Sequence, residues 1–272
     1  MNMTTIYNNF TEAVKKLFNE NEIIVEVGPG TYIYPAISIL QNVHPKAYIA
    51  IDGANTFDDA LENFNQRGGI MEYFRKMKKF LDEMPGNIIA INSLAHQLPL
   101  KSKSSDNILF VKTLWKLVDG ALNSWGKIKY SIIDKYKEIG ISYLNESDYR
   151  KLLILTYPLI VLEESRRVGR KGIAIIPEAS LVYENMIRNL QIYSEITGSK
   201  FFVLKVRRPT WTIIENGIER EVEHWQDNSS RNMIYIQTTN SAYLSRNEII
   251  EYLKGTNSCD NISFIYLCRK LF

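Results

Sequence analysis

Three polar features early in the sequence could together hold a nucleotide-type ligand. Glu26, Gly28 and Gly30 follow a short apolar run, and Asp52 follows the next one. Glycines after a buried strand give a tight turn whose backbone N–H groups a ligand can approach closely, at the start of a helix. An acid at the end of the neighbouring strand can accept hydrogen bonds from ribose hydroxyls, and it is expected roughly 20 residues further on. The pattern predicts a nucleotide-type cofactor loop.

Both acids also have plainer interpretations. Glu26 could cap backbone N–H groups in its own turn, alone or while contacting a ligand, and Asp52 could be a turn residue before Gly53. The dinucleotide fingerprint Gly-x-Gly-x-x-Gly is not met, because Ile33 stands where its third glycine would be. The spacing therefore favours a ribose role for Asp52 and disfavours NAD or FAD.

Few residues suit acid–base chemistry. His96 and His224 are candidate general bases, although a lone histidine is more often a packing or surface residue. Glu178 could hold a cationic or hydroxyl group of a substrate, or it could cap the helix that begins near Ser180. We therefore treat His96, Glu178 and His224 only as weak catalytic candidates.

The elements that must position these residues alternate along the chain. Alternating strands and helices up to residue 206 predict a mostly parallel sheet with helices on both faces, which binds ligands beyond the carboxyl ends of its strands. The predicted strands are 23–27, 47–51, 87–91, 107–111, 173–176 and 201–206. The predicted helices are 9–19, 35–42, 55–83 with a break at Gly68-Gly69, 124–139, 148–168 and 181–196.

The pattern changes after residue 206. Segments 211–214 and 218–224 flank Asn216-Gly217, which predicts a β-hairpin with a type I′ turn. A strand at 233–237, a helix at 246–254 and a last strand at 263–268 are predicted beyond it. No linker or repeat divides the chain. We expect a single domain, 1–272, with an N-terminal helical cover (1–21), an insertion (115–146) and a hairpin elaboration (209–240).

Composition sets the remaining bounds. The 272-residue chain has a net charge of +3, which is too balanced to indicate a nucleic-acid binder by itself. Its two cysteines have no metal-site spacing, so we expect no metal site and no disulfide framework. No signal peptide or apolar stretch of membrane-spanning length is present, so a soluble, cytoplasmic protein is expected.

The segment from Ile23 to Thr31 resembles motif I of class I S-adenosylmethionine-dependent methyltransferases, whose pattern is apolar–acid–apolar–Gly–x–Gly. Later segments resemble that family in order: Asp52 its ribose-binding acid, Leu98-Pro99-Leu100 its Leu-Pro-Phe turn, and the run 167–172 the glycine-containing run before its fifth strand. The run 264–270 resembles its last antiparallel strand. Tyr32 departs from the family, which often has glycine there. The spacing from Gly28 to Tyr34 is similar to that of small-molecule amine N-methyltransferases.

This resemblance implies a Rossmann-like, mostly parallel seven-stranded sheet and S-adenosyl-L-methionine as the cofactor. The implied reaction is in-line transfer of the cofactor's methyl group to a nucleophile. The resemblance and the strand ends together nominate ten cofactor-binding residues: Glu26, Gly28, Pro29, Gly30, Tyr34, Asp52, Gly53, Asn92, Ser93 and Lys112. Lys112 could equally be a solvated loop lysine.

The acceptor is expected to be a small molecule or a peptide side chain. A nucleic-acid base is disfavoured, because Phe110-Val111-Lys112-Thr113 lacks the Asp/Asn-Pro-Pro-Tyr/Phe motif and no Pro-Cys nucleophile is present. The insertion and the hairpin suggest either a partly enclosed acceptor pocket or an oligomer contact. In the second case the protein would be a homodimer. Two rival functions are a non-catalytic binding or scaffold subunit and an NAD-dependent oxidoreductase.

Overall fold

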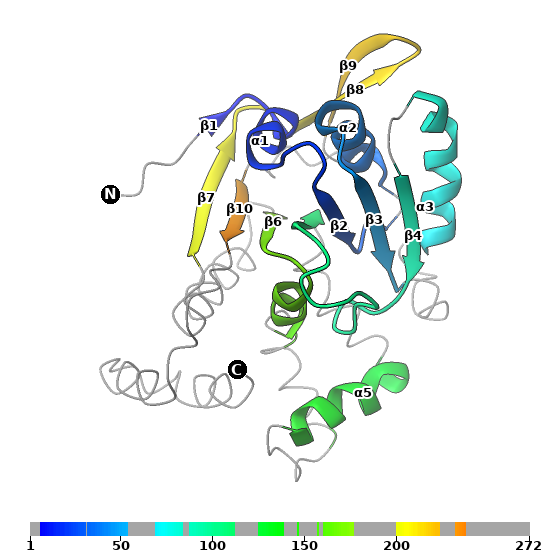
Figure 1. The fold of residues 1–272 in the computed structure, drawn as a ribbon, viewed down its shortest axis with the longest axis vertical. Coiled ribbons are helices and arrows are strands. Elements are labelled where there is room, and N and C mark those ends of the chain that lie inside the picture. Colours follow the sequence, from blue (N-terminus) through cyan, green and yellow to red (C-terminus); the bar gives the residue numbers. More distant parts are fainter. Residues whose placement is uncertain are drawn as a thin grey trace.

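The computed structural model describes residues 6–30, 32–53, 69–83, 87–111, 125–138, 146, 157, 160–176, 200–223 and 232–237 (Figure 1). The described strands are β1 (Ile6–Tyr7), β2 (Ile23–Val27), β3 (Ala47–Asp52), β4 (Asn87–Asn92), β5 (Asn107–Val111), β6 (Lys171–Ile176), β7 (Lys200–Val206), β8 (Thr210–Glu215), β9 (Ile218–Glu223) and β10 (Asn232–Gln237). The helices are α1 (Phe10–Leu17), α2 (Tyr34–Val43), α3 (Gly69–Met77), the 3₁₀ helix η3 (Lys78–Glu83), α5 (Trp125–Glu138) and an unlabelled helix, 160–168.

The described strands confirm a mixed α/β architecture with a mostly parallel sheet. The strand order is β1-β7-β10-β6-β5-β2-β3-β4, and only β10 runs antiparallel to its neighbours. Chain order runs outward from β2 to β4 on one side and from β5 to β6 on the other. The topological switch point therefore lies between β2 and β5, where such sheets bind ligands.

The expected seven-stranded sheet is wrong for the described residues, whose main sheet has eight strands. The addition is β1, a two-residue edge strand that pairs in parallel with β7 and was too short to give an alternating pattern. The antiparallel position between β6 and β7 is occupied by β10. Segments 181–196, 246–254 and 263–268 lie outside the described residues.

The central strands are buried because both faces of a parallel sheet are covered. Every residue of β5 is buried, and so are Ile24, Val25, Glu26 and Val27 of β2. The apolar side chains of α1 and α2 share one core cluster with Tyr48 of β3 and with Tyr73 and Met77 of α3. The predicted helix 55–83 is corrected at its end: residues 78–83 form a 3₁₀ helix, a tighter form that is common at helix C-termini.

The predicted hairpin is confirmed. Asn216 and Gly217 have positive φ angles of 54° and 73°, and Glu215 pairs with Ile218, as a two-residue type I′ turn requires. The Gln41 side chain of α2 binds both backbone groups of Ile214, with two N···O distances of 2.7 Å. The Phe10 ring of α1 packs on Trp211 at a centroid distance of 5.3 Å. The hairpin is therefore built onto α1 and α2.

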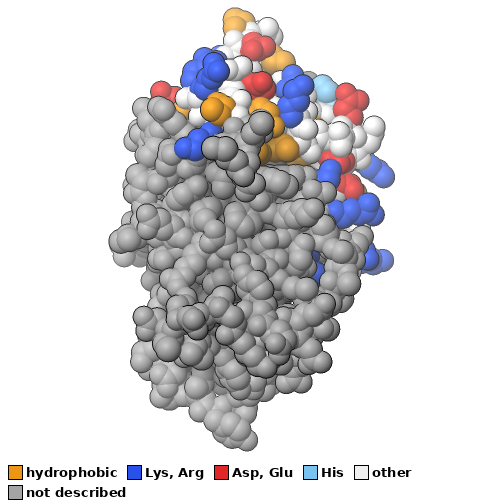
Figure 2. All heavy atoms as spheres, turned by 90° about the vertical axis from the view of Figure 1, so that its left-hand side faces the viewer, with side chains coloured by type: hydrophobic (Ala, Val, Ile, Leu, Met, Phe, Trp, Pro, Cys, Tyr) orange, Lys and Arg blue, Asp and Glu red, His pale blue; other side chains and the backbone are white. Residues whose placement is uncertain are grey.

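No described helix is both long and apolar enough to cross a membrane. On the face shown in Figure 2, the Lys and Arg side chains of the described residues are interspersed with Asp and Glu. The described part of that face therefore has no single sign of charge.

Gly169 gives a test of how tightly helix 160–168 packs on β5. A β-carbon at this position would lie 2.6 Å from Cγ1 of the buried Ile108. Gly169→Ala should lower the free energy of unfolding by about 1–3 kcal/mol through overpacking, as measured by urea denaturation. The matched control is Gly126→Ala in α5, where nothing lies within 4 Å and alanine should be neutral or stabilising. Equal effects of the two variants would contradict this packing.

Candidate functional site

The predicted glycine turn leaves the carboxyl end of β2 in a conformation that favours glycine. Gly28 and Gly30 have φ angles of 68° and 60°, where a β-carbon is strained. The Gly28 N–H donates to the Ile51 carbonyl oxygen at 2.7 Å. The Gly30 N–H donates to Oδ2 of Asp52, also at 2.7 Å. The loop after β2 is therefore held by the end of β3.

The next predicted site residues lie at the same edge of the sheet. Asp52 is the register partner of Asn92, and the Ser93 N–H donates to the Asp52 carbonyl oxygen at 3.2 Å. Asn92 is exposed, whereas Asp52 and Ser93 are half-buried. The carboxyl ends of β2, β3 and β4 thus converge, as expected for parallel strands. Figure 1 shows β3 and β4 ending at one edge, with α5 beyond it.

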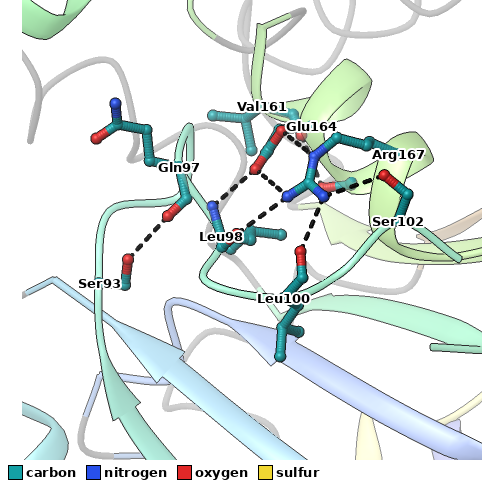
Figure 3. A network of polar contacts seen from close by, with 9 residues as sticks. Ser93, Gln97, Leu98, Leu100, Ser102, Val161, Glu164 and Arg167 are labelled. Carbon is teal, nitrogen blue, oxygen red and sulfur yellow. Dashed lines mark hydrogen bonds and ion pairs between the residues drawn. The ribbon is translucent and has the colours of Figure 1, made fainter. Parts of the chain in front are cut away.

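The loop that follows Ser93 is clamped to helix 160–168 (Figure 3). Glu164 Oε1 accepts the Leu98 N–H at 2.8 Å. Arg167 donates to the carbonyl oxygens of Leu98 and Leu100, at 3.0 and 2.8 Å. The Arg167 guanidinium also forms a two-point ion pair with Glu164, and this hydrogen bonding raises the pKa of Arg167. Two segments that the resemblance singled out, 98–100 and 167–172, therefore meet in space.

Tyr34 lies at the first position of α2, immediately after the loop. Its ring meets the Tyr32 ring edge-on at 5.4 Å, and the Tyr32 hydroxyl donates to the Glu223 carbonyl oxygen at 2.8 Å. Pro35, at the second helical position, suits a helix start because it lacks an N–H. The base of the β8–β9 hairpin thus touches the loop, while its turn lies toward the other end of α2, near Gln41.

Glu26 is completely buried beneath this loop. Its Oε2 atom accepts hydrogen bonds from the hydroxyls of Tyr48, at 2.8 Å, and Tyr73, at 3.0 Å. Its Oε1 atom has no hydrogen-bond partner among the described residues. Burial raises the pKa of Glu26 to about 7, against the lowering effect of the two tyrosines. The sequence did not indicate these tyrosines.

His96 is also completely buried, and it bridges two hydroxyl groups. Its Nδ1 lies 2.8 Å from the Tyr157 hydroxyl, and its Nε2 lies 3.1 Å from Oγ of Ser131 in α5. Since both ring nitrogens have partners, these contacts support a bridge between the 93–106 loop and α5 more than a general base. Lys112, Glu178 and His224 lie outside the described residues.

No protein-family model and no curated protein matches this chain. Solved structures with a similar arrangement include a SAM dependent methyltransferase from Aquifex aeolicus (16% identity, TM-score 0.47, 85% of this chain and 90% of that one). Another is the tRNA (m1A58) methyltransferase TrmI from Aquifex aeolicus (9%, 0.44, 85% and 68%). A third is M. capricolum TrmK in complex with S-adenosyl-homocysteine (13%, 0.40, 96% and 92%). All three are distant likenesses.

Glu26 should make the free energy of unfolding depend on pH. Its pKa rises from an ordinary 4.5 to about 7 on folding, so the folded chain holds a proton that the unfolded chain has released between these values. The resulting stability is complete below about pH 4.5 and is lost as the pH rises through 7, by up to roughly 3 kcal/mol. Urea denaturation of the wild type and Glu26→Gln across this range should give a difference that changes with pH. A constant difference would contradict the prediction.

His96 should matter for stability because it is completely buried and contacts two hydroxyls. His96→Ala removes a buried ring and leaves both hydroxyls without this partner, which should cost about 2–4 kcal/mol of unfolding free energy. Ser131→Ala, which removes only one of the two bonds, should cost about 1 kcal/mol. Both values can be measured by urea denaturation. An alanine variant of His96 within 0.5 kcal/mol of wild type, on the scale of ordinary surface substitutions, would speak against the bridge.

Proposed function

We propose that this protein is an S-adenosylmethionine-dependent methyltransferase whose cofactor binds at the carboxyl ends of β2, β3 and β4. The observation that carries the proposal is the hydrogen bond from the Gly30 N–H to Asp52, which joins the glycine turn to the acid expected to hold a ribose. A glycine turn and an acid at adjacent strand ends, next to the switch point, form the pattern expected for a nucleotide-type ligand.

The residues present fit this cofactor. A carboxylate has about four acceptor positions on its two oxygens, so the Gly30 bond leaves Asp52 capacity for ribose hydroxyls. The main chain at Gly28, Pro29 and Gly30 would line the cofactor, with Tyr34 at one side and Gly53, Asn92 and Ser93 at the adenosine. Lys112, which follows β5 in sequence, is assigned to the same site. The buried, unpartnered Oε1 of Glu26 can accept from the ammonium group of the cofactor's amino-acid end.

The bound cofactor would supply a methyl group on a positively charged sulfur, which is already a strong electrophile. The chain's task is then to fix the cofactor, align the acceptor nucleophile with the methyl carbon, and exclude water. His96, the described histidine that the sequence nominated as a base, contacts a hydroxyl at each ring nitrogen, which favours an acceptor that arrives as a neutral amine. We propose a small-molecule or peptide acceptor, bounded on one side by α5.

Calorimetry on the full chain with S-adenosylmethionine, S-adenosylhomocysteine and NAD tests the proposal. Both sulfur ligands should bind, and Asp52→Ala should weaken them by about a hundredfold, because it removes two charge-assisted hydrogen bonds to ribose. The matched control is Asp134→Ala on the exposed surface of α5, which should leave affinity unchanged. Binding of NAD alone would instead indicate an oxidoreductase. If neither sulfur ligand binds, the proposal is refuted.

The acceptor class needs a second experiment. Labelled S-adenosylmethionine can be incubated with the protein and separate pools of small amines, peptides and transfer RNA. Label in the amine or peptide pool would support the proposed acceptor class, and label in RNA would overturn it. Cofactor binding without transfer to any pool would favour the non-catalytic subunit.

A further inference from the structure

We propose that Tyr48 and Tyr73 are positioning residues that occupy Oε2 of Glu26 and reserve Oε1 for the cofactor's ammonium group, so that cofactor binding displaces a proton from Glu26. This inference rests on the proposed function and extends it to two residues and a proton that the motif does not include.

The two tyrosines reach Glu26 from different elements. Tyr48 belongs to β3, next to the strand that carries Glu26, and Tyr73 belongs to α3. Both side chains are completely buried, and both hydroxyls donate to the same oxygen, at 2.8 and 3.0 Å. Burial raises the pKa of both tyrosines well above the ordinary value, so they stay protonated and remain donors. Oε1 is left as the carboxyl oxygen without a partner among the described residues.

The Glu26 carboxylate has no compensating cation among the described groups that act on it. The described ionisable groups that act on this carboxyl are Tyr48 and Asp52 from β3 and Tyr73 from α3, and none of them is a cation. The tyrosine hydrogen bonds favour the ionised form, whereas burial and the negative charge of Asp52 favour the neutral form. A buried carboxylate without a cation is costly, so the ligand-free carboxyl holds its proton up to about pH 7, the value of its pKa.

An ammonium group supplies the missing cation and its N–H donors. When it binds at Oε1, the O–H bond of the carboxyl breaks, its proton passes to solvent, and an N–H···O bond to the carboxylate forms. No electron transfer is involved, and the buried site changes from a neutral acid to a neutral ion pair. The tyrosines allow this exchange because their two hydrogen bonds at Oε2 stabilise the carboxylate once it forms.

Proton release can be measured without turnover. Calorimetric titration of the full chain with S-adenosylhomocysteine near pH 6, in two buffers of different ionisation enthalpy, gives the number of protons released. We expect nearly one per site, and an affinity about thirtyfold weaker near pH 5.5 than near pH 8. Methylthioadenosine keeps the adenosine and the sulfur but lacks the ammonium group, so it should bind without proton release and with little dependence on pH.

Variants then separate the roles of the three residues. Glu26→Gln, which keeps the shape of the side chain, should abolish proton release. Tyr48→Phe and Tyr73→Phe should each keep the release but move the midpoint of the pH profile upward, because each removes a bond that favours the carboxylate. Circular dichroism and thermal unfolding identify variants that are folded, and a misfolded variant does not affect the decision because the wild-type titrations stand alone.

The outcomes distinguish this inference from the proposed function. If S-adenosylhomocysteine binds wild type equally well near pH 5.5 and pH 8 without releasing a proton, the inference is overturned and the cofactor assignment stands. Equal proton release with methylthioadenosine would overturn it as well, because the ammonium group would then not be the cause. If the wild type binds neither ligand, the proposed function fails and the inference fails with it.

Discussion

The hydrogen bond between the Gly30 N–H and Asp52 joins the two chain segments on which the site depends. It forms because β2 and β3 are adjacent and parallel, with Val27 beside Ile51, so that both strands end at the same edge. The positive φ angles of Gly28 and Gly30 let the chain turn back over that edge without a steric penalty. The Ser93 N–H extends the arrangement to β4 through the Asp52 carbonyl oxygen. A single acidic residue thus connects three strand ends.

Glu26 places an ionisable group inside an otherwise apolar part of the core. A carboxyl group within the apolar core opposes folding unless it is neutral or has partners, and here two tyrosine hydroxyls reach only one of its oxygens. Such departures from an all-apolar core are expected where a protein binds or reacts. The carboxyl is completely buried, so bulk water does not solvate it. The property that costs stability is therefore the same one that prepares the group for a cationic ligand.

The supporting loops are fixed by polar contacts over long distances in sequence. The 93–106 loop has little regular structure, yet the Glu164–Arg167 pair binds its backbone at Leu98 and Leu100, and His96 connects it to α5. At the hairpin, the Gln41 side chain hydrogen-bonds to both backbone groups of Ile214, as a neighbouring strand would. These contacts satisfy buried backbone groups that would otherwise lack partners. They give irregular segments near the site a defined position.

The sequence alone determined the features that depend on neighbouring residues. Runs of β-branched residues predicted β2, β3 and β5, and Asn216-Gly217 predicted the hairpin turn. The spacing from Gly28 to Asp52 nominated the cofactor loop. Whether the nominated residues contact the cofactor stays a prediction. Only the tertiary structure decided that Asp52 binds Gly30, that β1 adds an eighth strand, and that β10 fills the antiparallel position. It alone placed Tyr73, 47 residues away in sequence, against Glu26. The reason is physical: a turn or a strand is favoured by adjacent residues, whereas a buried hydrogen bond depends on partners that only the packed sheet and helices bring together.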